Sequence, residues 1–266
     1  RSTSIATGLG ASAHGESASA NGTGAHATGY SATAQGANTT AIGSSAISKA
    51  KDSTALGNGA QATALGATAL GALTTASGYY SLASGYNAKA SGEYSQASGY
   101  KATASGYISQ ASGVEAVATG RFSQALGDKA SASGYVSQAL GTDAKASGDF
   151  STASGYLANA SGDASTALGP QATASGDFST ALGEGAKATF ARSTAIGGGS
   201  KTSRANQMVL GRTDIEVTIA NLEKAGSHNP QAVYVQTDGT LTRSTAIAYG
   251  LGASAHGENA SANGTG

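Results

Sequence analysis

Glycine recurs every seven residues through most of this chain. Between Gly8 and Gly197 this spacing offers 28 positions, and 25 of them are Gly. Alanine stands two residues before the Gly position in 27 of the 28 cases. A fixed short period is typical of a solenoid, in which each repeat stacks on the next. With 40 Gly and 58 Ala among 266 residues, the chain also has too few large side chains for an ordinary globular core.

The true repeat is fourteen residues long. If the heptad is numbered so that Gly is position 7, position 3 alternates between Ser and Ala from Ser81 onward. A Ser heptad, with S-Q-A-S-G at Ser95–Gly99, is followed by an Ala heptad, with A-T-A-S-G at Ala102–Gly106. A coiled coil is excluded, because each Gly would cost a helix about 1 kcal/mol and the heptads lack a paired apolar seam.

Small residues at positions 3 and 5 predict a very narrow interior. Side chains alternate along a strand, so positions 3 and 5 share one side and positions 4 and 6 share the other. Gly at position 7 is expected to supply the positive φ of a tight turn. We predict an all-β roll with one short strand per heptad, two strands per coil and the coils stacked in register.

The outward faces of the two heptads differ in chemistry. Positions 4 and 6 of the Ala heptads are mostly polar and include several Lys, which indicates a solvated face. The Ser heptads from Ser81 onward carry no charge at these positions. Five of them place an aliphatic residue at position 6: Leu126, Leu140, Leu168, Leu182 and Ile196.

A bulky stripe precedes the Ser strands at position 2. Its members are spaced by fourteen residues: Tyr80, Tyr94, Ile108, Phe122, Val136, Phe150, Ala164 and Phe178. An exposed apolar stripe of this length is an association surface, and an interior of Ala and Ser buries little area. We therefore predict that the Ser strands and the stripe pack against identical chains. Composition alone leaves open whether two or three chains meet.

Pentapeptides in phase with the period resemble a known family. The motif S-T-A-L-G at Ser53–Gly57 and Ser165–Gly169, and S-T-A-I-G at Ser193–Gly197, alternate with A-x-A-x-G. They resemble the head repeats of trimeric autotransporter adhesins, the YadA-like family of Gram-negative surface proteins. The resemblance covers residues 2 to about 197 and resumes over about 244–266. It implies a left-handed parallel β-roll, three of which form a parallel homotrimer.

The resemblance also implies a function and a location. It predicts a rigid rod on the bacterial cell surface that attaches to a host extracellular-matrix protein or a cell-surface receptor. It predicts an anchor in the outer membrane, formed by a C-terminal part outside this sequence. Direct membrane contact by these residues is not expected.

The family pattern can be carried onto individual positions. It implies that the small residues at positions 3 and 5 point inward and that the position 6 aliphatics named above face the trimer axis. Together with three members of the stripe, they form our predicted trimer interface: Leu126, Leu140, Leu168, Leu182, Ile196, Phe122, Phe150 and Phe178. Serine replaces the aliphatic residue in four coils, where we expect a wetter axis: Ser84, Ser98, Ser112 and Ser154.

Outward residues of the Ala strands are the candidates for ligand contact, because they are the accessible ones. At position 4 these are Lys89, Thr103, Val117, Lys145, Asn159, Thr173 and Lys187. Binding on a repetitive surface of this kind is spread over many weak contacts.

Three segments are predicted along the chain. Residues 1–197 form the head roll, 198–243 a small β-rich connector or insert, and 244–266 the start of a second roll. In the middle segment Ile215, Val217 and Ile219 alternate like a strand, and Thr237–Gly239 is a hairpin-type turn signal. A floppy linker is the alternative.

Repetition at the two ends indicates that the chain is part of a longer protein. Arg1–Gly24 recurs as Arg243–Gly266 with three differences. We expect the parent protein to carry several such blocks in tandem.

Composition and motifs point away from catalysis. There is no Cys for disulfides or thiolate metal sites, and 15 basic residues balance 15 acidic ones, which disfavours nucleic-acid binding. The four histidines, including His14 and its counterpart His256, lie outside any recognisable catalytic context. We predict no enzyme activity, no cofactor and no metal.

Two other functions compete with adhesion. An ice-binding β-solenoid would need an unbroken rank of Thr. Thr does occupy position 4 of four successive Ser heptads, at Thr152, Thr166, Thr180 and Thr194. Gln occupies the same position in the four preceding coils, however: Gln96, Gln110, Gln124 and Gln138. A purely structural spacer of a surface fibre is the other alternative. A left-handed β-helix acyltransferase is disfavoured, because its repeat has six residues.

Overall fold

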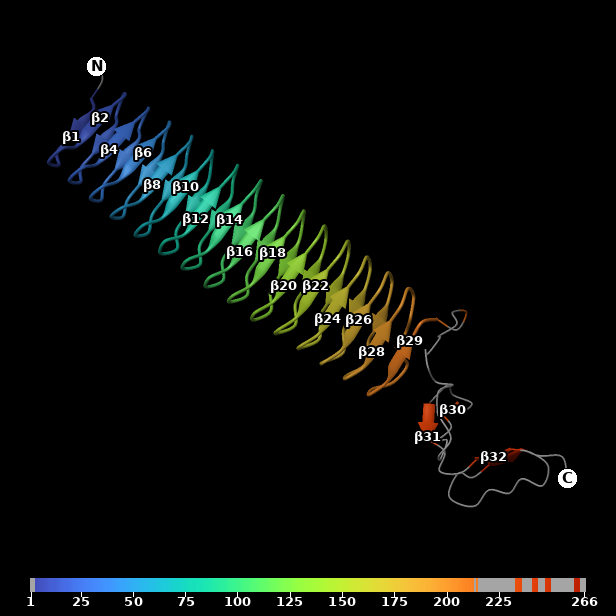
Figure 1. The fold of residues 1–266 in the computed structure, drawn as a ribbon. Helices are drawn as coiled ribbons and strands as arrows, with labels where there is room; N and C mark the ends of the chain where they lie inside the picture. The colour runs from blue at the N-terminus through green and yellow to red at the C-terminus, as the bar shows by residue number, and fades with distance from the viewer. Residues whose placement is uncertain are drawn as a thin grey trace. The chain divides into compact units, whose positions relative to one another are not determined.

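The computed structural model describes residues 3–212, residue 214 and four short strands between residues 233 and 263. The chain divides into two compact units, Arg1–Glu216 and Val217–Gly266. The first is a parallel β-solenoid of two sheets, with 14 and 15 strands, whose arrows repeat side by side along the roll in Figure 1. The described residues contain no helix. This confirms the predicted all-β roll with two strands per coil.

Strands of two residues form the 14-stranded sheet, which we call the Ala sheet because its strands belong to the Ala heptads. They are β1 (Ile5–Ala6), β3 (Ser19–Ala20), β5 (Thr33–Ala34), β7 (Ile47–Ser48), β9 (Gln61–Ala62), β11 (Thr75–Ala76), β13 (Lys89–Ala90), β15 (Thr103–Ala104), β17 (Val117–Ala118), β19 (Ser131–Ala132), β21 (Lys145–Ala146), β23 (Asn159–Ala160), β25 (Thr173–Ala174) and β27 (Lys187–Ala188).

Strands of three residues form the 15-stranded sheet, which we call the Ser sheet. They are β2 (Ser12–His14), β4 (His26–Thr28), β6 (Thr40–Ile42), β8 (Thr54–Leu56), β10 (Thr68–Leu70), β12 (Leu82–Ser84), β14 (Gln96–Ser98), β16 (Gln110–Ser112), β18 (Gln124–Leu126), β20 (Gln138–Leu140), β22 (Thr152–Ser154), β24 (Thr166–Leu168), β26 (Thr180–Leu182), β28 (Thr194–Ile196) and β29 (Met208–Leu210).

Every parallel pair in the roll is in register. Residues fourteen apart face one another, as in Ala97↔Ala111 and Ala111↔Ala125 of the Ser sheet, and Lys89↔Thr103 of the Ala sheet. Neighbouring strands lie about 4.8 Å apart, so each coil advances the roll by that distance. Equivalent side chains of successive coils therefore form straight rows.

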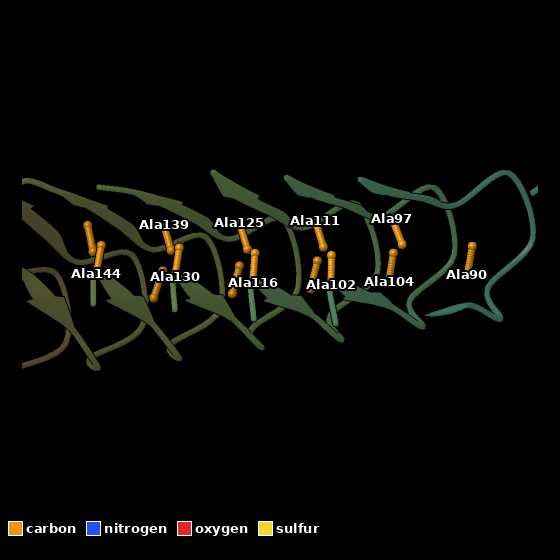
Figure 2. Close-up of a cluster of buried hydrophobic side chains, with 14 of the residues drawn as sticks. Ala90, Ala97, Ala102, Ala104, Ala111, Ala116, Ala125, Ala130, Ala139 and Ala144 are labelled. Carbon is orange, nitrogen blue, oxygen red and sulfur yellow. The ribbon is translucent and has the colours of Figure 1, made fainter. Parts of the chain in front are cut away.

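The interior holds only small side chains, as predicted. Ala at positions 3 and 5 is fully buried along the roll, and Thr39 and Thr74 are the largest fully buried residues among those described. Figure 2 shows Ala97 and Ala104, from opposite sheets, pointing toward one another across the interior. Because the sheets are this close, each residue adds little apolar area, and stability depends heavily on the backbone hydrogen-bond ladders.

Glycine is found at position 7 for a different structural reason in each of the two sheets. After the Ser-sheet strands its φ is positive, for example 137° at Gly113. After the Ala-sheet strands φ is not in that region, so our expectation that every Gly supplies a positive φ is wrong there. At Gly106, for instance, an added Cβ would lie 1.9 Å from the carbonyl oxygen of Gly120 in the next coil. Close approach of successive coils favours Gly at these positions, although Ala50, Ala64 and Phe190 stand at three of them.

Position 2 is the left-handed residue of the turns, although it is rarely Gly. The φ of Tyr80 is 50°, that of Ile108 is 50° and that of Val136 is 53°. This conformation lets the position 2 N–H donate to a carbonyl of the preceding coil, from Ile108 to Glu93 at 2.9 Å and from Val136 to Arg121 at 2.9 Å. The turns are therefore hydrogen-bonded from coil to coil, like the strands.

Aspartate at turn position 1 links four successive coils. The N–H of Tyr135 donates to Asp149 Oδ1 at 2.9 Å, that of Asp149 to Asp163 Oδ1 at 3.0 Å, and that of Asp163 to Asp177 Oδ1 at 3.2 Å. Each carboxylate thus accepts a hydrogen bond from the coil before it. These aspartates stabilise the stacking of the coils.

Strands of the second unit form two pairs. β30 (Val233–Val235) and β31 (Leu241–Arg243) are antiparallel, and β32 (Ile247–Tyr249) and β33 (Ser261–Asn263) are parallel with the fourteen-residue register of the roll. In the first unit β29 extends the Ser sheet beyond residue 197. The predicted boundaries of the three segments stay predictions. The expected strand over Ile215–Ile219 and the turn at Thr237–Gly239 lie outside the described residues.

The close approach of coils predicts a contrast between two Gly→Ala substitutions. Gly106→Ala should lower the free energy of unfolding by about 1–3 kcal/mol, because backbone atoms must shift to admit the methyl group. Gly198→Ala should be nearly neutral, because φ is not positive there and the nearest atom, Glu184 O, is 3.8 Å away. Urea unfolding of the full chain measures both, and equal destabilisation would refute the distinction.

Buried serines supply a second contrast. Ser95 Oγ donates to the carbonyl oxygen of Gly92 at 2.7 Å, whereas Ser109 Oγ is equally buried and has no partner. Ser95→Ala should cost about 1 kcal/mol, and Ser109→Ala should be neutral or stabilising, because it removes an unsatisfied hydroxyl. Differential scanning calorimetry of the two variants compares them directly. A larger loss at Ser109 would contradict this hydrogen-bond pattern.

Candidate interaction surfaces

The Ser sheet presents aliphatic rows at position 6. The register places Leu126 beside Leu140 and stacks Leu168, Leu182 and Ile196 in successive coils. Leu182 is 43% exposed in the single chain, and the other four are half-buried. The same register aligns Ile42, Leu56 and Leu70 nearer the N-terminus. Most of these side chains are too far from the interior to be covered by their own chain.

Four coils of the Ser sheet carry Ser in place of the aliphatic residue. Ser84, Ser98 and Ser112 follow one another in register and interrupt the apolar row for three coils, and Ser154 interrupts it again between Leu140 and Leu168. The row therefore consists of three aliphatic stretches, separated by a hydroxyl stretch of three coils and by the single Ser154.

Position 4 of the Ser sheet is mostly polar and uncharged, with Leu82 and Met208 as apolar exceptions. The four Gln residues from Gln96 to Gln138 form one in-register row, and Thr152, Thr166, Thr180 and Thr194 form the next. From β6 to β29 neither outward row of this sheet contains a charged residue. Thr ranks are therefore present, one of four coils here and one of three coils at Thr40, Thr54 and Thr68, and they share their face with the aliphatic rows.

The stripe at position 2 is a ladder of exposed rings. Tyr80 and Tyr94 stack with centroids 5.7 Å apart, and both are at least half exposed. Edge-to-face contacts link the next coils: Tyr94 with Tyr107, Tyr107 with Phe122, Phe122 with Tyr135 and Tyr135 with Phe150. Phe178 is 62% exposed. The rings thus form one continuous edge from Tyr80 to Phe150.

Sequence reasoning missed two members of this ladder. Tyr107 and Tyr135 stand at turn position 1, not position 2, and they bridge the gaps left by Ile108 and Val136. The guanidinium of Arg121 lies 5.2 Å from the centroid of Tyr107 and 5.6 Å from that of Phe122. The sequence did contain a signal for them, because a Tyr directly precedes both Ile108 and Val136, the two positions of the stripe where an aliphatic residue replaces a ring.

The Ala sheet presents the opposite chemistry. Its position 4 row runs in register from Lys89 and Thr103 through Val117 to Lys145 and Lys187, so the seven predicted ligand-facing residues lie on one face. The three lysines are exposed, and the other four are half-buried. Position 6 of the same heptads from Ser91 to Thr189 is exposed throughout.

A shallow groove of about 330 Å³ lies on this face. Four of the seven predicted ligand-facing residues line it: Lys145, Asn159, Thr173 and Lys187. The remaining lining residues are Asp143, Leu157, Ala158, Gln171 and Gly185. Lys89, Thr103 and Val117 share the face but lie outside the groove.

The described residues hold no cluster of side chains suited to a metal ion. Residues 3–212 and 214 contain no group of three His, Cys, Asp or Glu side chains that could bind a metal ion. His26 Nδ1 lies 2.6 Å from Ser12 Oγ at the surface. The described part of the chain also lacks a helix of the length and apolarity needed to span a bilayer.

Among the described residues, one ion pair shifts the pKa values of its two members, and it lies at the end of the first unit. The guanidinium of Arg212 donates from Nε to Asp214 Oδ1 at 2.9 Å. This hydrogen bond lowers the pKa of Asp214 and raises that of Arg212. Both side chains are more than half exposed, so the pair is a surface contact.

Comparison with known proteins gives one family and one solved structure of note. The YadA head domain repeat matches residues 20–46, 48–74, 76–95, 97–123, 137–158, 160–183 and 174–200. The collagen-binding domain of the Yersinia adhesin YadA is similar, with 24% sequence identity and a TM-score of 0.37, over 66% of this chain and 82% of that domain. No curated protein sequence matches. Because the repeat matches span more than half of its residues, the chain belongs to the YadA head domain repeat family and is an adhesin head.

Proposed function

We propose that this chain acts as a homotrimeric rod that attaches bacteria to host extracellular-matrix proteins or cell-surface receptors. The contrast between its two faces carries the proposal. The Ser sheet and the aromatic edge are uncharged or apolar, whereas the Ala sheet is solvated and carries exposed lysines. One face suits self-association, and the other suits contact with a ligand.

Self-association is supported by the large apolar groups that the single chain leaves uncovered. Aromatic and aliphatic side chains such as Phe150 (58% exposed) and Leu182 (43% exposed) form continuous rows along the roll, instead of being exposed singly at separate places. Contiguous apolar surface of this kind marks a protein interface. The likeness to trimeric autotransporter adhesins favours three chains, which cyclic symmetry closes around one axis.

Bulky residues at position 2 give further support. A β-branched residue in the left-handed region is strained by roughly 1–2 kcal/mol relative to Gly, yet Ile108 and Val136 occupy it. Gly or Asn would make the same coil-to-coil hydrogen bond with less strain. Burial of these side chains between protomers offsets the strain.

On this proposal the trimer interface contains Leu126, Leu140, Leu168, Leu182 and Ile196, with Phe122, Phe150 and Phe178 from the stripe. The Ala sheets face outward on all three protomers. The rod stands on the bacterial surface and is anchored in the outer membrane. Its activity is binding, without catalysis or a cofactor.

A pair of Lys substitutions tests the assignment of faces. Leu140→Lys places three like charges in the proposed interface of each trimer and should weaken association by tenfold or more. Thr103→Lys adds the same residue on the Ala sheet and should leave the trimer intact. Analytical ultracentrifugation over a concentration series gives the mass of each variant. Equal weakening by both substitutions, or a wild-type chain that is monomeric, would refute the interface.

Attachment is tested by solid-phase binding of the purified chain to collagen, fibronectin and laminin, with albumin as the negative surface. Saturable binding to at least one matrix protein is expected. Lys89→Glu with Lys145→Glu should reduce it several-fold, because these residues lie on the Ala sheet. Lys101→Glu with Lys129→Glu changes the net charge equally in adjoining turns and should have little effect. Binding no stronger than to albumin would contradict the proposed function.

A further inference from the structure

The groove on the Ala sheet crosses four successive coils. Its long axis follows the row Lys145, Asn159, Thr173 and Lys187, in which each residue is the register partner of the next. Three coil steps of about 4.8 Å separate the two lysines, so the row spans roughly 14 Å. This length suits a short stretch of a linear polymer that lies along the roll.

Differences in side-chain size create the groove. Lys145 and Lys187 are long and exposed, and they stand at the two ends. The half-buried Asn159 and Thr173 are shorter, so the surface dips between the lysines. Gly185 widens the dip, because a Cβ added there would meet no atom within 4 Å. The groove is therefore open to solvent along its length.

The lining offers three kinds of contact to an anionic ligand, and it also contains one carboxylate, that of Asp143, so its net charge is positive by one. Neither Lys145 nor Lys187 forms an ion pair with another described residue, so both ammonium groups are available to anions. Amide and hydroxyl groups of Asn159, Gln171 and Thr173 lie between them and can both donate and accept hydrogen bonds. Leu157, 42% exposed, adds an apolar patch on one side.

Backbone pairing with an extended peptide is blocked at this site. β21, β23 and β25 are internal strands of the Ala sheet, each paired on both sides. β27 is the last strand of that sheet, and an isolated bridge between Lys187 and Lys201 covers its outer side. Peptides that add to a sheet need an open edge, where unpaired N–H and C=O groups are available. Only side chains can hold a ligand here, which favours one rich in its own hydroxyl groups.

We propose that this groove binds a linear acidic polysaccharide, with an anionic group at each lysine and sugar hydroxyls on the amides between them. The charge complements the two free ammonium groups, and the apolar face of a sugar ring fits against Leu157. The inference rests on the proposed function, because the trimer leaves the Ala sheets exposed. Each groove binds weakly, and three grooves on one rod raise the avidity for a long polymer.

Isothermal titration of the intact full-length chain with short oligosaccharides tests the groove without avidity. The probes are octasaccharides of hyaluronan, which carry carboxylates only, and of chondroitin sulfate, which carry carboxylates and sulfates. Maltooctaose is the neutral control, and an eight-residue polyglutamate is the acidic peptide control. We expect wild-type binding to one or both acidic oligosaccharides and to neither control. Binding of hyaluronan assigns the contact to carboxylates, and binding of chondroitin sulfate alone assigns it to sulfates.

Matched variants locate the site. Lys145→Ala with Lys187→Ala should weaken binding roughly tenfold, the combined effect of two exposed ion pairs. Lys101→Ala with Lys129→Ala removes the same charge outside the groove and should leave the affinity unchanged. Thr173→Trp fills the groove without a change of charge and should also weaken binding.

Three results would overturn the proposal: equal loss in the two double variants, equal affinity for polyglutamate, or no binding of either acidic oligosaccharide. Solid-phase binding to the matrix proteins is measured on the same preparation. Intact matrix binding without oligosaccharide binding refutes the groove alone, whereas loss of both also refutes the proposed function.

Discussion

The width of the interior is the constraint on which the rest of this structure depends. Two sheets meet through Ala at position 5 of each heptad and through Ala or Ser at position 3, and these residues are fully buried. A coil this thin cannot bury large side chains, so every large residue is placed in a turn or on an outward face. The rings of the aromatic edge, the aliphatic rows and the lysines of the Ala sheet are all consequences of that exclusion.

Periodicity was sufficient to predict the roll. Two strands per coil, the register of fourteen residues, the buried positions and the difference between the two faces follow from residue types that repeat in phase. Features that depend on backbone conformation were harder to predict from the sequence. Positive φ was expected at Gly of position 7, and the structure has it there only after the Ser-sheet strands. Position 2, as in Tyr80 and Ile108, is left-handed as well, because its N–H donates to the preceding coil.

The sequence predicted that the residues of the candidate site share one row, but it did not predict the groove. Lys145, Asn159, Thr173 and Lys187 were chosen because they are accessible, and they lie together as expected. The groove also depends on Leu157, Gln171 and Gly185, which come from the neighbouring turns. They shape the groove because their side chains differ in size from those at the same position in adjacent coils. A repeat pattern describes what the coils share, so it does not predict such differences. The interface residues, from Leu126 to Phe178, stay predictions, because they concern a second chain.

Each coil meets its two neighbours through the same set of hydrogen bonds and the same register. Whole repeats can therefore be gained or lost by slippage or unequal recombination in the gene without an interior mismatch, because the new neighbours meet as the old ones did. The length of the roll can change by such events while the fold stays the same, and on the proposed function this would also change the distance between the binding face and the cell. A shift by one heptad would instead place an Ala strand on a Ser strand and expose the apolar rows on the wrong face.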